Sequence, residues 1–220
     1  MKNNRIAIAI DKSDSNFDLQ NFAKNFPQNT MLKIGLEYFT KFGSIALEGL
    51  NNDIFLDLKF YDIPNTVYHA VKNASLIKNV KLMTIHAQGG KKMIEIAVNA
   101  RNETNESVAI VCVTKLTSEN ANIDDIYKLT DLALNSGADG IVCSAQEIDL
   151  LREKFGNEFL AVTPGIRPSW YIENDDQVRI CTPREAISKG ADIIVIGRPI
   201  TKNPNPSMAL QKVIDEIKNA

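Results

Sequence analysis

Eight short apolar runs, most of them rich in β-branched residues, alternate with longer segments of helical periodicity along the 220-residue chain. This alternation predicts βα units arranged around a parallel sheet. The expected strands cover residues 5–10, 31–34, 53–58, 82–86, 107–113, 140–143, 160–163 and 193–196. The expected helices cover residues 17–26, 37–50, 66–78, 91–101, 123–135, 145–155, 183–189 and 207–218.

Eight βα units in a chain of this length predict a single (β/α)8 TIM barrel of the α/β class, with residues 1–220 as one domain. A doubly wound open sheet is the competing fold. Polar residues at or just beyond the expected strand ends favour the barrel, because its strand ends converge on one mouth, whereas an open sheet spreads them apart. These residues are Asp11, Lys33, Asp57, Lys59, His86, Thr117, Ser118, Thr163, Gly197 and Arg198.

The third expected strand ends in charges that need an explanation. Alternation along the strand puts Asp57 and Lys59 side by side on one face. Asp62 follows, which completes the spacing Asp-x-Lys-x-x-Asp. A salt bridge at a strand end is the simplest interpretation, but a buried ion pair adds little net stability because desolvation cancels much of the Coulomb gain.

Lys33 strengthens a catalytic interpretation of these charges. It lies inside the apolar run 31–34, where an unpaired cation would be costly, so it needs a carboxylate partner. On its own, Lys33 could be an edge lysine whose ammonium reaches solvent. Together, Lys33, Asp57, Lys59 and Asp62 make a neutral, alternating charge array that a partly dry cavity can tolerate. We therefore expect these residues at an active site.

The segments after the last two strands suit a phosphate group. Gly197 lets backbone amides approach an anion and Arg198 supplies a cation, at the place where barrels frequently hold phosphate. The connection 164–179 is much longer than a usual βα loop and could close as a lid. It carries Arg167, Gln177 and Arg179 as candidate phosphate ligands. The alternatives are an ordinary turn and a mobile surface loop.

Composition argues against several classes of partner. A net charge of −2, a pI near 5.8 and scattered basic residues argue against nucleic acid. The sequence has no apolar stretch of membrane-spanning length and no signal-peptide pattern, so we expect a cytoplasmic protein. No metal site is expected, because the cysteines lack zinc or disulfide spacing and the histidines are too few. These residues are Cys112, Cys143, Cys181, His69 and His86.

Several motifs together resemble the orotidine 5'-phosphate decarboxylases over nearly the whole chain. They are Asp57-x-Lys59-x-x-Asp62-Ile63-Pro64-Asn65-Thr66, Lys33-Ile34-Gly35, Leu116-Thr117-Ser118, Thr163-Pro164-Gly165-Ile166-Arg167-Pro168 and Ile196-Gly197-Arg198. The Asp-x-Lys-x-x-Asp core is shared with sugar-phosphate decarboxylases and synthases of the same suprafamily. Metal-dependent relatives typically have a magnesium-binding glutamate on the second strand, where this chain has Lys33. The bulky segment Ser169-Trp170-Tyr171-Ile172 departs from the small residues common in that loop.

The resemblance implies that orotidine 5'-monophosphate loses carbon dioxide to give uridine 5'-monophosphate in de novo pyrimidine biosynthesis, without a cofactor. It implies that Lys59 stabilises the carbanion at C6 and then protonates it, while Asp57 faces the departing carboxylate. The other implied ligands are Asp11 and Lys33 for the ribose, Thr117 and Ser118 for the pyrimidine edge, and Arg167, Gln177, Gly197 and Arg198 for the phosphate.

The resemblance also implies a homodimer with shared sites. Asp62 and Thr66 would reach into the mouth of the neighbouring barrel, and Pro64 would stiffen the turn that carries them. Two other functions remain open at this point. One is a magnesium-dependent sugar-phosphate decarboxylase or aldolase of the same suprafamily. The other is a barrel that binds phosphorylated metabolites without turnover.

Overall fold

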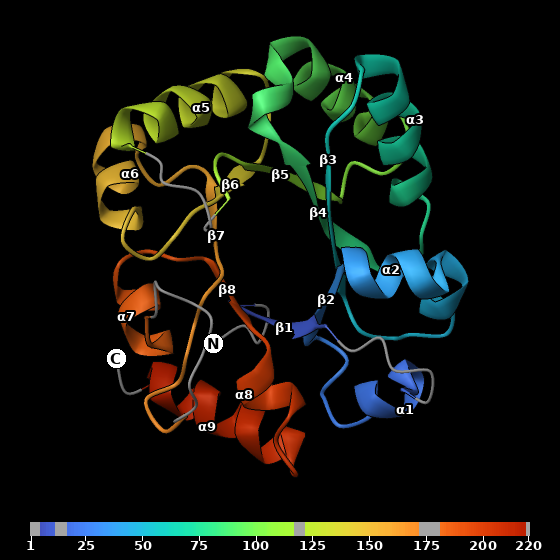
Figure 1. Cartoon of the computed structure of the whole chain (residues 1–220), viewed down its shortest axis with the longest axis vertical. Helices are drawn as coiled ribbons and strands as arrows, with labels where there is room; N and C mark the ends of the chain where they lie inside the picture. The colour runs from blue at the N-terminus through green and yellow to red at the C-terminus, as the bar shows by residue number, and fades with distance from the viewer. Residues whose placement is uncertain (1–4, 12–16, 117–121, 172–180, 219–220) are drawn as a thin grey trace.

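The computed structural model describes residues 5–11, 17–116, 122–171 and 181–218. Eight parallel strands pair in chain order, and the last pairs with the first to close a barrel (Figure 1). The predicted (β/α)8 fold is confirmed. The strands are β1 (Ile6–Ile10), β2 (Met31–Gly35), β3 (Ile54–Phe60), β4 (Val80–His86), β5 (Ala109–Val113), β6 (Gly140–Val142), β7 (Leu160–Thr163) and β8 (Ile193–Ile196).

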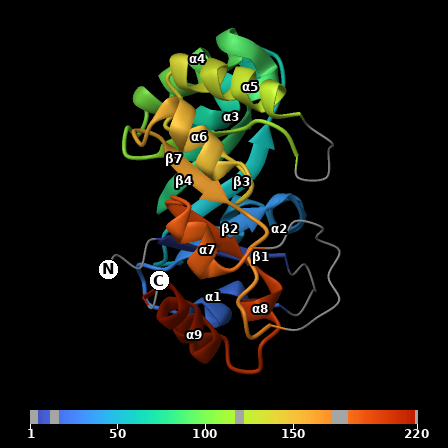
Figure 2. The same ribbon diagram turned by 90° about the vertical axis from the view of Figure 1, so that its left-hand side faces the viewer.

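Helices surround the barrel, and Figure 2 shows α8 and α9 at the opposite end of the molecule from α4 and α5. The α-helices are α1 (Leu19–Ala23), α2 (Leu36–Phe42), α3 (Pro64–Ser75), α4 (Gly90–Asn102), α5 (Ile123–Asn135), α6 (Ile148–Phe155), α7 (Pro183–Ser188), α8 (Arg198–Thr201) and α9 (Pro206–Lys218). Two short 3-10 helices are η2 (Ser44–Leu47) and η3 (Ala87–Gly89). None of the helices in the described ranges combines the length and apolar character needed to cross a membrane.

Two predicted helices need correction, and one further helix was not predicted. The helix expected over 37–50 is broken, because Gly43 adopts a positive φ of 66° that ends α2 before η2 begins. The helix expected over 17–26 is reduced to α1, which the Asp18 side chain caps by accepting a hydrogen bond from the Asn21 backbone N–H. The short helix α8, directly after β8, was not predicted.

Alternation along the strands divides the core into two layers. Outward side chains such as Ile54 and Leu56 pack under the helices in one large apolar cluster. Inward side chains such as Phe55 form a second cluster that fills the barrel interior. Near the carboxyl end of β3, the inward positions change from apolar to charged at Asp57, which is only 9% exposed. The packed interior therefore ends where the charged mouth begins.

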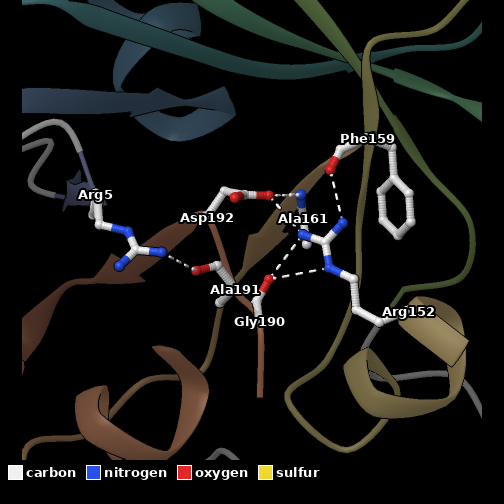
Figure 3. Close-up of polar contacts among 7 residues, drawn as sticks. All are labelled: Arg5, Arg152, Phe159, Ala161, Gly190, Ala191 and Asp192. Atoms are coloured by element: carbon white, nitrogen blue, oxygen red, sulfur yellow. Dashed lines mark hydrogen bonds and ion pairs between the residues drawn. The ribbon is translucent and has the colours of Figure 1, made fainter. Parts of the chain in front are cut away.

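The amino end of the barrel is held by arginines bonded to backbone carbonyls and carboxylates. Figure 3 shows the Arg152 guanidinium of α6 between Phe159, Gly190 and Asp192. The Asp192 carboxylate also accepts a hydrogen bond from the Ala161 N–H, at 2.8 Å. This joins α6 to the starts of β7 and β8.

A second, similar arrangement lies two βα units earlier. Arg101 of α4 donates to Val108 O and to the Asp139 carboxylate, which also accepts from the Ile110 N–H. Asp139 and Asp192 each end the tripeptide Gly-Ala-Asp that leads into an even-numbered strand, at residues 137–139 and 190–192. The pair of Arg101 and Asp139 and the pair of Arg152 and Asp192 therefore stabilise the amino end of the barrel in the same way.

Candidate active site

A cavity of about 250 Å³ opens at the carboxyl ends of the strands. Phe55, Val162 and Val195 form part of its apolar floor. Its wall contains most of the site residues that the sequence pointed to, which come from the ends of β1, β2, β3 and β8 and from the segment after β7. These residues are Asp11, Lys33, Asp57, Lys59, Arg167, Gly197 and Arg198. Parallel strands of a closed barrel deliver them to one place although they are far apart in the chain.

Asp57 is the centre of the charge array. The Lys59 ammonium lies 2.9 Å from Asp57 Oδ1, and the Lys33 ammonium lies 3.3 Å from Asp57 Oδ2. Lys33 also lies 3.8 Å from the Asp11 carboxylate, so the order of charges is Asp11, Lys33, Asp57, Lys59. Two cations thus flank one carboxylate whose side chain is only 12% exposed. The array alternates in sign within a single chain.

The surroundings of Asp57 keep its carboxyl group ionised. Burial acts to raise the pKa of Asp57, but the charges of Lys33 and Lys59 outweigh it and lower the pKa below its usual value. Hydrogen bonds from Lys59 and Thr84 act in the same direction. An ionised carboxylate at this position can hold both ammonium groups in place.

Thr84 is a site residue that the sequence reasoning missed. Its side chain is fully buried on β4, and its hydroxyl contacts both Asp57 Oδ1 and the Lys59 backbone N–H, each at 2.9 Å. Threonine is common in strands, so on its own it gives no functional signal. The available signal was its position. Thr84 lies two residues before His86 on the expected strand 82–86, so the two side chains share one face of that strand.

Arg167 and Arg198, which follow β7 and β8, add positive charge to the lining of the cavity. Arg167 is 8% exposed and donates from Nη1 to Ile166 O, while Arg198 begins α8 directly after β8. Gly197 lies against β1, where an added Cβ would be 3.4 Å from both Ala9 Cβ and Asp11 Oδ2. Lys115 also lines the cavity and was not predicted. The two arginines and the approachable backbone at Gly197 suit an anionic group.

Two predicted residues lie away from the cavity of their own chain. Asp62 is exposed, and its Oδ1 accepts a hydrogen bond from the following backbone N–H of Ile63, at 2.7 Å. Thr66 is exposed in the first turn of α3. Neither residue lines the cavity, so within one chain Asp62 does not join the charge array. Thr117, Ser118, Gln177 and Arg179 lie outside the described residues.

The bulky segment after β7 is attached to α9. The Trp170 ring packs on the outer core, with the Lys212 ammonium 5.5 Å from the ring centroid. The Ser169 N–H donates to the Glu216 carboxylate at 3.3 Å. The beginning of the long connection is therefore attached to α9. Residues 172–180 of this connection are outside the described ranges.

The remaining polar candidates of the sequence lie away from the charge array. Burial raises the pKa of the Cys112 and Cys143 thiols to about 12, which makes both poor nucleophiles. The His86 ring stacks on Tyr61, with centroids 5.5 Å apart. Among the described residues, no group of three or more histidine, cysteine, aspartate or glutamate side chains has the arrangement of a metal site.

Comparisons with known proteins agree with these features. The model of the "Orotidine 5'-phosphate decarboxylase / HUMPS family" matches residues 4–213. The orotidine 5'-phosphate decarboxylase of Nitrosomonas eutropha is 43% identical, with 100% of both chains covered. That of Hahella chejuensis is 42% identical, covering 98% of this chain and 97% of its own. The solved orotidine 5'-phosphate decarboxylase of Lactobacillus acidophilus is 31% identical with a TM-score of 0.82, covering 98% of this chain and 99% of its own. This chain therefore belongs to the orotidine 5'-phosphate decarboxylase / HUMPS family.

Proposed function

We propose that this protein converts orotidine 5'-monophosphate to uridine 5'-monophosphate and carbon dioxide in pyrimidine biosynthesis, without a metal or other cofactor. The observation that carries the proposal is the array of Lys33, Asp57 and Lys59 in a cavity that Arg167 and Arg198 also line. A nucleotide has a reacting base at one end and a phosphate at the other. The array suits the reacting base, and the two arginines suit the phosphate.

In the proposed reaction, the bond between C6 of the pyrimidine and its carboxylate breaks, and the electron pair stays on C6. The Lys59 ammonium stabilises this developing negative charge and then transfers a proton to C6. Carbon dioxide leaves, and Lys59 regains a proton from solvent. Because one residue supplies both the charge and the proton, the step needs no metal ion.

Asp57 has two roles in this proposal. It holds the Lys59 ammonium at 2.9 Å and so sets its position before substrate arrives. It also faces the substrate carboxylate, and two unit charges about 4 Å apart repel by roughly 4 kcal/mol at an effective dielectric constant near 20. This repulsion disappears when carbon dioxide leaves, so it favours the transition state over the bound substrate.

The rest of the nucleotide is held by groups that do not react. We assign Asp11 and Lys33 to the ribose hydroxyls, because they form the end of the array away from Lys59, with the Lys33 ammonium 3.8 Å from the Asp11 carboxylate. The remaining assignments are Thr117 and Ser118 to the pyrimidine edge, and Arg167, Gln177, Gly197 and Arg198 to the phosphate. Binding energy from the phosphate would hold the pyrimidine against the array, so it serves catalysis as well as affinity.

We further propose a cytoplasmic homodimer in which Asp62 and Thr66 complete the partner's site. Both residues are exposed at the rim, and the exposed side chains of Tyr61 and Ile63 give the same rim an apolar surface. A two-fold interface across this rim would bring each Asp62 toward the other chain's mouth. The array would then gain a further aspartate, Asp62, from the neighbouring chain.

Ultraviolet absorbance of orotidine 5'-monophosphate mixed with the protein tests the activity. We expect complete conversion to uridine 5'-monophosphate, with an unchanged rate after exhaustive EDTA treatment. Activity that is lost on chelation and restored by magnesium would contradict the metal-free proposal and favour a magnesium-dependent relative. Binding of the nucleotide without conversion would favour the non-catalytic alternative.

Mixing two inactive variants tests the shared site. A dimer of one Lys59→Ala chain and one Asp62→Asn chain contains one site with neither change and one site with both. Random pairing makes half the dimers mixed, so activity should recover to roughly a quarter of the parent value. If chain exchange is verified by mass spectrometry and the mixture stays inactive, Asp62 acts in its own chain.

Orotidine without its phosphate tests the role of Arg167 and Arg198. We expect a lower turnover number at saturation as well as weaker binding, with partial recovery when inorganic phosphite is added. An Arg198→Ala variant should respond to the missing phosphate much less than the parent does. Equal turnover numbers for the two substrates would mean that the phosphate serves only as an anchor.

A further inference from the structure

Lys59 has an uncommon backbone conformation for a residue with a side chain. Its φ is 50°, and among the described non-glycine residues only Lys59 and Asn79 have a positive φ. This left-handed region is unfavourable for residues with a Cβ, so the backbone at Lys59 is strained. Such a conformation persists only where surrounding contacts hold it.

The strain at Lys59 coincides with a break in the sheet. The pairing of β3 with β4 shifts register between Leu56 and Phe60, as in a β-bulge. A bulge re-aims the side chain it carries and leaves a backbone group without its usual partner in the sheet. At this bulge the Lys59 N–H bonds to the Thr84 side chain rather than to a backbone carbonyl of β4.

The Thr84 hydroxyl has a single possible direction for its proton. The Lys59 N–H is a donor, so the hydroxyl must accept from it through a lone pair. Ionised Asp57 is an acceptor only, so the hydroxyl must donate its one hydrogen to Oδ1. Asp57 Oδ1 is also the atom that the Lys59 ammonium contacts. Thr84 therefore closes a ring that joins the Lys59 backbone, the Asp57 carboxylate and the Lys59 ammonium.

We propose that Thr84 is a positioning residue of the active site, which holds the strained backbone of Lys59 and orients Asp57 so that the ammonium faces the reacting carbon. The inference rests on the proposed function for its catalytic consequence, but its geometric part stands on these contacts alone. Without the hydroxyl, the Lys59 backbone can relax toward the extended conformation and Asp57 can turn. The phosphate and ribose contacts come from other strands, so substrate binding should change little.

Three variants separate positioning from packing. Thr84→Val keeps the shape of the side chain and removes both hydrogen bonds, whereas Thr84→Ser keeps the hydroxyl and removes a methyl group. Thr130→Val is the matched control, because Thr130 is equally buried, lies on α5, and has a hydroxyl with no hydrogen-bond partner. If burial of a threonine were all that mattered, the two valine variants would behave alike.

Steady-state kinetics with orotidine 5'-monophosphate test the catalytic part. A small displacement of a catalytic group can reduce rate about 100-fold, so we expect kcat of Thr84→Val to fall by that order, with KM within about threefold. Thr84→Ser should restore kcat to within about tenfold of the parent, and Thr130→Val should match the parent. A kcat of Thr84→Val within threefold of the parent, or a serine variant as impaired as the valine variant, would overturn the proposal.

Hydrogen exchange of the Lys59 amide tests the geometric part without any turnover. We expect this amide to be protected in the parent, in Thr84→Ser and in Thr130→Val, and to exchange at least tenfold faster in Thr84→Val. Unchanged protection in Thr84→Val would show that Thr84 does not hold the Lys59 backbone. If the parent fails to convert the nucleotide, the proposed function is wrong, and this exchange measurement still decides whether Thr84 holds Lys59.

Discussion

Charged side chains at the two ends of the barrel differ in how fully their hydrogen-bonding groups are used. At the amino end, Arg152 donates from Nε, Nη1 and Nη2 to Gly190 O, Phe159 O and the Asp192 carboxylate. At the carboxyl end, the ammonium groups of Lys33 and Lys59 converge on Asp57 and also line a cavity. An ammonium has three donors, so these lysines keep capacity to bind a ligand.

The difference separates the sources of stability and of chemistry in this fold. The Arg152 guanidinium fixes the starts of β7 and β8, and hydrogen bonds to the protein itself occupy most of its N–H groups. The charge array at the mouth is held by only a few contacts and faces open space. Removing an arginine at the amino end of the barrel should therefore lower stability, whereas removing a lysine at the carboxyl end should lower activity.

The largest expected effect on stability belongs to Arg152→Met. Methionine keeps part of the apolar stem but leaves the acceptors of Gly190, Phe159 and Asp192 without their donor. Breaking a mostly buried ion pair in this way should lower the free energy of unfolding by about 3 kcal/mol. Urea unfolding followed by circular dichroism measures it, and kcat per folded molecule should stay within twofold. A large loss of kcat in fully folded protein would contradict the separation of the two ends.

An intermediate effect, dependent on pH, is expected for Asp57→Asn. Removing the carboxylate leaves Lys33 and Lys59 facing each other, and the free energy of unfolding at pH 7 should fall by about 2 kcal/mol. Folding lowers the pKa of Asp57, so its stabilisation is fully present above the unfolded value of about 3.9 and is lost as pH falls through the folded value. The difference between parent and variant should therefore shrink below about pH 4.

Unfolding measured from pH 7 to pH 3 checks this window. The other acidic groups are the same in both proteins, so the difference between the parent and Asp57→Asn isolates the contribution of the Asp57 carboxyl group. A difference between parent and Asp57→Asn that stays constant down to pH 3 would mean that the pKa of Asp57 is not lowered by folding.

The smallest effect on stability is expected for Arg101→Met. This variant allows the two arginines at the amino end of the barrel, Arg101 and Arg152, to be compared. Arg101 donates from Nη1 alone, to Val108 O and Asp139, and its buried Nε has no hydrogen-bond partner. Removing an unsatisfied donor offsets part of the loss, so the free energy of unfolding should fall by only about 1 kcal/mol. Urea unfolding of both arginine variants in one buffer tests this order. A larger loss for Arg101→Met than for Arg152→Met would contradict it.

Much of the fold could be predicted from local patterns in the sequence. Periodicity indicated every strand, because apolar alternation is set by the residues of the strand itself. Asp57 and Lys59 were placed together for the same reason, since they are two residues apart on β3. The break at Gly43 was missed because helical periodicity continues through it, and only the positive φ ends α2 there.

Contacts between distant segments could not be read in the same way. Thr84 meets Lys59 through a register shift between β3 and β4, and no local pattern signals such a shift. Arg152 and Asp192 are separated by 40 residues, and the repeated Gly-Ala-Asp tripeptide acquires meaning only when both copies are seen at strand starts. Asp62 fits the sequence motif, but in its own chain its carboxylate accepts from the Ile63 N–H and does not line the cavity.

The central claim is that the mouth supplies the chemistry and Lys59 supplies the proton. Lys59→Ala tests it most directly, in a single preparation assayed for turnover of orotidine 5'-monophosphate, binding of uridine 5'-monophosphate and urea unfolding. We expect turnover to fall by at least 1,000-fold, about 4 kcal/mol of barrier, with nucleotide binding still measurable and the free energy of unfolding within about 1 kcal/mol of the parent. Turnover within tenfold of the parent, about 1.4 kcal/mol of barrier, would remove Lys59 from this role.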